Sequence, residues 1–80
     1  MGQVDETVGS LLAEVLQIPA SGVTEDLAMK DIDAWDSLKH MELIVSLEQS
    51  FGIEFTFDDI VAMRSVAEIK RVLRERGAAS

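Results

Sequence analysis

Apolar residues recur every three or four positions in three separate segments of this 80-residue chain. Such spacing gathers apolar side chains on one face of an α-helix, the face that a small domain buries. It predicts long helices over about residues 3–17, 37–51 and 66–76, with a short helix after Thr56. Residues 53–57 alternate as a strand would, but a lone strand has no partner, so we interpret them as a loop whose aromatic side chains enter the core. The pattern therefore predicts an all-α fold, a small four-helix bundle with three long helices and one short one.

Residues that start and stop helices support these bounds. Pro19 cannot continue the first helix, and Gly52 provides a stop for the second. Thr56 is suited to cap the short helix. Ser65 and Glu68 have the spacing of a capping box, in which each side chain bonds the backbone N–H of the other.

The long connection and the last helix carry further signals. Residues 18–36 show no sustained period, and a structureless connection of that length is usually functional or mobile in a compact domain. The last helix holds basic residues that suit the negative end of its dipole, namely Lys70, Arg71, Arg74 and Arg76.

The second long helix carries two apolar stripes on different faces. One stripe suits the core and consists of His40, Leu43, Ile44, Leu47 and Phe51. The other consists of Leu38, Met41 and Val45. A helix in so small a domain needs only one buried face, so the second stripe either lies under the long connection or is offered to a partner protein.

The bulk composition bounds the class of protein. The chain is 48% hydrophobic, so we expect a single folded domain over residues 1–80, with a core over about 4–75. A formal net charge of −8 disfavours nucleic acid and anionic membranes as partners and favours proteins with basic docking patches. The absence of cysteine excludes disulfides and cysteine-based metal sites. Without a signal-peptide pattern or an apolar run of membrane-spanning length, we expect a cytoplasmic monomer that is not inserted in a membrane.

Carboxylates are crowded in the first sixty residues, which hold 13 Asp and Glu against 2 Lys and Arg, a charge of −11. Mutual repulsion would raise carboxyl pKa values on folding, and stability would then fall as pH rises through the range where these groups ionise. The clusters are Glu25/Asp26, Asp31/Asp33/Asp36 and Asp58/Asp59. The middle cluster is similar to the opening of an EF-hand loop but lacks its glycine and distal glutamate, so we expect no dedicated metal site.

Ser37 stands where the long connection gives way to the second long helix. A serine there is most often an N-cap, whose oxygen accepts a hydrogen bond from a backbone N–H. A hydrolytic nucleophile would instead need a base within reach and a third group to orient that base. His40, the only histidine, falls on the stripe suited to the core, and no G-x-S-x-G turn is present. We therefore expect no catalytic residue.

The segment Trp35-Asp36-Ser37-Leu38-Lys39-His40-Met41-Glu42-Leu43-Ile44 resembles the phosphopantetheine-attachment segment of acyl and peptidyl carrier proteins. The similarity covers most of the chain, continuing through Leu47-Glu48 and Phe51-Gly52-Ile53 to Ile60, Val66 and Ile69. The resemblance implies that Ser37 carries a covalent 4'-phosphopantetheine arm, whose thiol holds an acyl or aminoacyl group as a thioester, and that the chain itself is no enzyme. Trp35 before Asp-Ser-Leu is more similar to discrete carriers of specialised metabolism, of polyketide or nonribosomal-peptide type, than to fatty-acid carriers.

The resemblance also implies partners, namely a phosphopantetheinyl transferase, an acyl- or aminoacyl-loading enzyme, and downstream synthases or transferases with basic docking patches. Asp36 would assist recognition by the transferase. The stripe of Leu38, Met41 and Val45 would meet apolar patches on partners, and Glu42 would pair with arginine or lysine. The alternative hypothesis is an unmodified helical adaptor that binds another protein through the same stripe.

Overall fold

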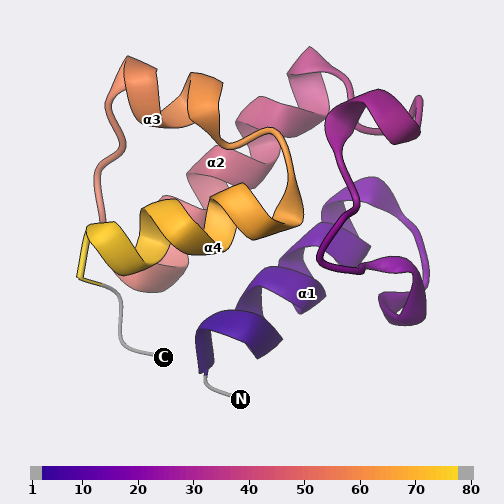
Figure 1. Cartoon of the computed structure of the whole chain (residues 1–80), viewed down its shortest axis with the longest axis horizontal. Coiled ribbons are helices and arrows are strands. Elements are labelled where there is room, and N and C mark those ends of the chain that lie inside the picture. Colours follow the sequence, from indigo (N-terminus) through magenta and orange to yellow (C-terminus); the bar gives the residue numbers. More distant parts are fainter. Residues whose placement is uncertain (1–2, 78–80) are drawn as a thin grey trace.

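The computed structural model describes residues 3–77 of the chain. It contains four α-helices, α1 (Gln3–Leu16), α2 (Ser37–Phe51), α3 (Phe57–Ala62) and α4 (Val66–Glu75), and two short 3-10 turns, η1 (Ala20–Gly22) and η2 (Met29–Asp31). α1 packs against both α2 and α4, and α3 packs against α4 (Figure 1). Within residues 3–77 the structure has no strand, only an isolated bridge. The predicted all-α bundle of three long helices and one short one is confirmed.

The core lies where α1, α2 and α4 meet. The predicted stripes supply most of it, namely Val4, Val8, Leu12 and Leu16 of α1, Leu43, Ile44 and Leu47 of α2, and Val66, Ile69, Val72 and Leu73 of α4. Trp35, Phe55 and Met63 complete it from outside the long helices. The bundle is therefore held mainly by three apolar helix faces, as the spacing predicted.

One aromatic residue departs from the predicted core. Phe55 is buried, but Phe57 is exposed, so the expectation that both aromatic side chains of residues 53–57 enter the core is wrong. The alternation that would keep residues 55 and 57 on one side holds only while the chain stays extended. The chain becomes helical at Phe57, which turns this side chain outward.

The connection between α1 and α2 is not structureless, contrary to the expectation. Besides η1 and η2, it is hydrogen-bonded to the start of α4, because Met29 N–H donates to the Arg64 carbonyl and Val66 N–H to the Leu27 carbonyl, both at 2.9 Å. A bridge pairs Ala28 with Ser65 there. Residues from the middle of the chain are thereby fixed against its last helix.

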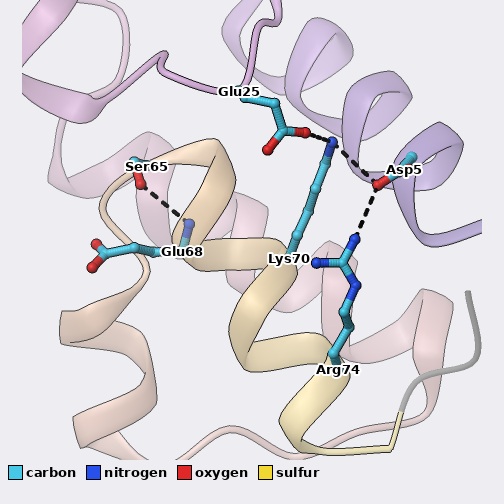
Figure 2. Close-up of polar contacts among 6 residues, drawn as sticks. All are labelled: Asp5, Glu25, Ser65, Glu68, Lys70 and Arg74. Carbon is cyan, nitrogen blue, oxygen red and sulfur yellow. Dashed lines mark hydrogen bonds and ion pairs between the residues drawn. The ribbon is translucent and has the colours of Figure 1, made fainter.

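The helix ends follow the predicted signals in most places. Gly52 ends α2 with a left-handed φ of 66°, and Thr56 caps α3. Thr56 and Asp59 form a full capping box, with bonds of 3.1 and 3.2 Å. The predicted box at the start of α4 is only half formed, since Ser65 accepts from Glu68 N–H but the hydrogen bonds of the described residues include no return bond (Figure 2).

Lys70 ties together three parts of the chain that lie far apart in sequence. Its nearly buried ammonium contacts Asp5 of α1 at 3.2 Å and Glu25 of the connection, and Arg74 also reaches Asp5 at 3.5 Å (Figure 2). Arg76 pairs with Asp59. Lys70, Arg74 and Arg76 therefore pair with carboxylates of other elements, which the sequence did not predict, while Arg74 also lies in the last turn of α4, as predicted.

Three pKa values are shifted by these contacts. Burial alone would lower the pKa of Lys70, but hydrogen bonds and attraction from Glu25 and Asp5 raise it above its usual value. The hydrogen bond and charge of Lys70 lower the pKa of Asp5. The pKa of Asp59 is lowered as well, mainly by the hydrogen bond that the Thr56 backbone N–H donates to its carboxylate. For Asp59 the expectation that crowding raises carboxyl pKa values is therefore wrong, because the hydrogen bonds from Thr56 and the Arg76 cation outweigh the effect of burial, which alone would raise the pKa.

The lowered pKa of Asp5 gives the folded chain an acid-sensitive contact. The unfolded chain binds a proton at Asp5 first as pH falls, so this stabilisation is present above the unfolded value of 3.8 and is lost below it. We expect the melting temperature of Asp5→Asn to lie below that of the wild type near pH 6 and the two to converge between about pH 4 and 2. Circular dichroism melts at constant ionic strength measure this. A gap that widened on acidification would contradict the assigned direction.

A second prediction compares two neighbouring cations of α4. Lys70→Met keeps the apolar stem but leaves Glu25 without its cation and Asp5 with Arg74 alone, and we expect a loss of about 1 to 2 kcal/mol in the free energy of unfolding. Arg71→Met makes the same charge change, but Arg71 only pairs with Glu75 on the exposed surface, so the loss should stay under about 0.5 kcal/mol. Urea unfolding of both variants gives the comparison. Equal losses would show that Lys70 has no special structural role.

Candidate functional site

The hydroxyl of Ser37 is exposed at the first residue of α2. The helix cap is Asp36, whose Oδ1 accepts from Lys39 N–H at 2.9 Å while its carbonyl accepts from His40 N–H at 2.8 Å. The interpretation of Ser37 as an N-cap is therefore wrong. Aspartate caps as well as serine does, and here the aspartate stands one position earlier. The serine side chain is left directed to solvent, with no capping role.

A buried hydrogen-bonded chain lies behind this serine. Trp35 Nε1–H donates to His40 Nδ1 at 3.0 Å, and His40 Nε2 lies 2.9 Å from the Ile60 carbonyl of α3. An indole N–H can only donate and a carbonyl can only accept, so the imidazole is in its neutral form with the proton on Nε2. Both ring nitrogens are thus engaged inside the core. His40 cannot act as a base toward Ser37, which agrees with the expectation of no catalytic pair.

The second stripe of α2 is exposed, so the long connection does not cover it. Leu38, Met41 and Val45 are 68%, 46% and 47% exposed. They line an open groove of about 470 Å³ together with Glu42, Ser46 and, from α1, Val15. The groove begins at the residue next to Ser37. An exposed apolar groove of this kind is typical of a surface that binds another molecule.

The acidic residues of the groove and of the loop before α2 make only weak or local contacts. Glu42 lies 3.7 Å from Lys39, an exposed pair of the kind that contributes about 0 to 1 kcal/mol. In the acidic loop, Asp31 Oδ2 accepts from Ala28 N–H at 3.0 Å, so this carboxylate, like that of Asp36, bonds the local backbone. Residues 3–77 contain no group of three or more His, Cys, Asp or Glu side chains placed to hold a metal ion.

Sequence reasoning located Ser37 and the stripe but missed the structural roles of Asp36 and Trp35. Asp36 could have been identified as the cap, because aspartate is a preferred N-cap residue. The contact of Trp35 with His40 had no local signal, since a spacing of five residues does not place side chains on one helix face.

Across residues 3–77, no helix is long and apolar enough to cross a membrane.

The cap assignment gives a test within the site. Asp36→Ala should lower the free energy of unfolding by about 0.5 to 2 kcal/mol, because the first turn of α2 loses its side-chain acceptor. Ser37→Ala should change it by less than about 0.5 kcal/mol, since an exposed hydroxyl is removed without a buried partner being left unpaired. Urea unfolding of the two variants measures both values. A larger loss for Ser37→Ala would return the capping role to the serine.

Comparison with known proteins places this geometry in a family. The family model described as phosphopantetheine attachment site matches residues 6–73. An acyl carrier protein of Chlamydia caviae is 32% identical over 74 residues, covering 91% of this chain and 95% of the relative. The solution structure of holo acyl carrier protein from Geobacter metallireducens superposes with a TM-score of 0.80 at 28% identity, covering 94% of this chain and 86% of that one. The chain therefore belongs to the acyl carrier protein family, whose members are carriers without catalytic activity of their own that bear a covalent 4'-phosphopantetheine.

Proposed function

We propose that Ser37 is the residue to which 4'-phosphopantetheine is attached. The observation that carries this proposal is an exposed hydroxyl at the first position of α2, freed from capping by Asp36. A transferase needs an oxygen that solvent and enzyme can reach, and the Ser37 hydroxyl meets that requirement. The Asp36-Ser37-Leu38 sequence lies within the segment matched by the family model.

The surroundings of Ser37 fit a phosphodiester. The N–H groups of Ser37 and Leu38 belong to the first turn of α2, where backbone donors have no partner within the helix. The positive end of the helix dipole favours an anion there. The Asp36 carboxylate, the nearest like charge in sequence, already accepts from Lys39 N–H. A phosphate on Ser37 would therefore be held by the backbone of its own helix.

The chain's residues position the cargo and take no part in bond chemistry. When attached, the arm supplies a thiol that holds the acyl or aminoacyl group as a thioester. Ser37 directs the attachment point outward from the start of α2, and the exposed stripe beside it offers apolar contacts to the enzymes that load and unload the carrier. In this proposal Leu38, Met41 and Val45 form the apolar contact, and Glu42 meets a lysine or arginine of the partner.

The finer assignments are also proposals. Asp36 would assist the phosphopantetheinyl transferase in addition to capping α2. Residues 1–80 would form one monomeric carrier domain, acting in the cytoplasm. Trp35 before Asp36-Ser37-Leu38 favours a role in specialised metabolism of polyketide or nonribosomal-peptide type, because this order of residues resembles that of discrete carriers in such pathways. Elongation of the holo chain by fatty-acid synthase enzymes as fast as their own carrier would contradict that role.

The attachment proposal is tested by intact mass. After incubation with coenzyme A and a broad-specificity phosphopantetheinyl transferase, the wild type should gain one phosphopantetheine and Ser37→Ala none. Ser46→Ala, on the same helix and lining the same groove, is the matched control and should be modified like the wild type. Helical circular dichroism of all three proteins excludes unfolding as the cause. A mass gain by Ser37→Ala would rule out this residue.

A further inference from the structure

The only histidine and the only tryptophan of the chain are hydrogen-bonded to each other inside the core. Trp35 is 2% and His40 7% exposed, and their ring centroids lie 6.1 Å apart. Neither side chain holds the arm or its cargo in the proposed function. Histidine is the side chain whose charge most readily changes between about pH 5 and 8, and this one stands three positions after Ser37. A titratable group is therefore buried directly behind that serine.

The two hydrogen bonds of the ring require a neutral imidazole. The Trp35 indole can only donate, so His40 Nδ1 has to offer its lone pair, while Nε2 carries the proton that the Ile60 carbonyl accepts. A proton taken up from solvent would add to the lone pair of Nδ1, the one ring atom that accepts. The new Nδ1–H would then face the indole N–H, donor against donor, and the Trp35–His40 bond would break. The bond from Nε2 to Ile60 would remain, because Nε2 keeps its proton.

Trp35 has few other polar contacts to hold it in place. Its backbone N–H donates to the Ile32 carbonyl at 3.3 Å, which is longer than the usual value of about 2.9 to 3.0 Å. An indole donor without its acceptor is unfavourable inside the core, so the side chain would have to move toward another acceptor or toward water. Only Asp36 separates Trp35 from Ser37. Movement of Trp35 would therefore displace the backbone on the N-terminal side of Ser37.

Charged side chains on the elements around the ring do not replace the broken bond. Within residues 3–77, the hydrogen bonds of the imidazole are those to Trp35 and Ile60. The buried cation of α4, Lys70, is already occupied by Glu25 and Asp5. The other charged residues nearest in sequence to the three bonded groups are Asp33 and Asp36 before α2, Lys39 on α2, Asp58 and Asp59 on α3, and Arg64 after α3. None of them gives the indole a new acceptor.

We propose that His40 is a positioning residue for the modification of Ser37, and that a proton on its imidazole reverses this positioning. With neutral His40, the bond to Trp35 holds the segment before Ser37 in the arrangement that a phosphopantetheinyl transferase engages. With protonated His40, the bond is broken and the modification is slower. This inference rests on the proposed attachment at Ser37, and it adds a control of that step by pH.

Two substitutions each keep the Trp35–His40 bond in one state. His40→Gln imitates the closed state, because a glutamine amide has an acceptor oxygen and N–H donors but takes up no proton. Trp35→Phe imitates the open state, because it keeps a buried aromatic ring without the indole donor. Helical circular dichroism of both variants at each pH shows whether they are folded.

The kinetic test compares kcat/KM for modification at about pH 8 and about pH 5, with coenzyme A and one purified broad-specificity transferase. Each variant is divided by the wild type at the same pH, so the pH dependence of the transferase itself cancels. His40→Gln should equal the wild type at the higher pH and exceed it about fivefold at the lower pH, because only the wild type loses the bond. Trp35→Phe should be about fivefold slower than the wild type at the higher pH and equal to it at the lower pH.

Fluorescence gives an independent measurement without any enzyme, because Trp35 is the only tryptophan. Its emission should follow a titration curve for one proton in the wild type and stay constant in His40→Gln. The matched control combines His40→Gln with Gln49→His, which moves the histidine to an exposed position in the last turn of α2. This control should also give constant emission, since the histidine no longer contacts Trp35.

The outcomes separate this inference from the proposed function. A His40→Gln rate equal to that of the wild type at both pH values overturns the role of His40 and leaves Ser37 as the attachment residue. Constant Trp35 emission in the wild type overturns it as well, because the bond would then not respond to pH. Should His40→Gln fail to fold, Trp35→Phe decides, and a wild-type rate for that variant at the higher pH overturns the inference. A wild-type chain that gains no mass at either pH overturns both.

Discussion

Two hydrogen bonds to one imidazole fix the end of the molecule that carries Ser37. Trp35 comes from the connection, His40 from the first turn of α2 and Ile60 from α3, and their polar atoms meet inside the core. A buried polar group left without its partner costs about 1 to 3 kcal/mol, so each of the three residues constrains the other two. The orientation of the Asp36-Ser37 step and the place of α3 therefore depend on the same ring.

At the start of α2, the capping role of Asp36 and the proposed role of Ser37 fall on adjacent residues. Asp36 has an extended backbone, with φ −94° and ψ −174°, which lets its side chain turn back to Lys39 N–H. Ser37 is already helical, so its side chain points away from the helix axis and cannot reach the same donors. The cap is thus provided by a carboxylate, and the hydroxyl can be modified without the helix losing its start.

Local patterns predicted the helices well because the forces that define helix bounds act over a few residues. The range Ser37–Phe51, the stop at Gly52 and the cap at Thr56 all follow from side chains within one turn. The same reasoning gave the second stripe, which follows from the spacing of apolar side chains on α2, but left open whether the stripe is exposed. It did not identify Asp36 as the cap in place of Ser37, since both residue types are good caps and the sequence does not show which one takes the extended backbone.

Long-range contacts were beyond local reasoning. Lys70 meets Glu25 forty-five positions away, and the spacing of charges on α4 indicates only that a cation faces one side. The bonds of Met29 to Arg64 and of Val66 to Leu27 similarly join backbone groups that every residue possesses, so no residue type marks them. The exposure of Phe57 depended on where the helix began. In each case the sequence pattern indicated a local preference, and contacts with distant parts of the chain or the start of a helix decided the outcome.

The distribution of cations determines the charge that a partner would meet near Ser37. Lys70 and Arg74 form ion pairs with Asp5 of α1, and Arg76 forms one with Asp59 of α3. Much of the basic charge at the C-terminal end of the chain is therefore neutralised by carboxylates of other helices. Lys39 is not used in this way, because it stands two residues after Ser37 and lies 3.7 Å from Glu42 of the same helix. An enzyme that uses Glu42 must displace Lys39 from an exposed pair, which costs only about 0 to 1 kcal/mol. The chain can thus keep Glu42 paired in solution and still yield it to a stronger cation on a docking enzyme.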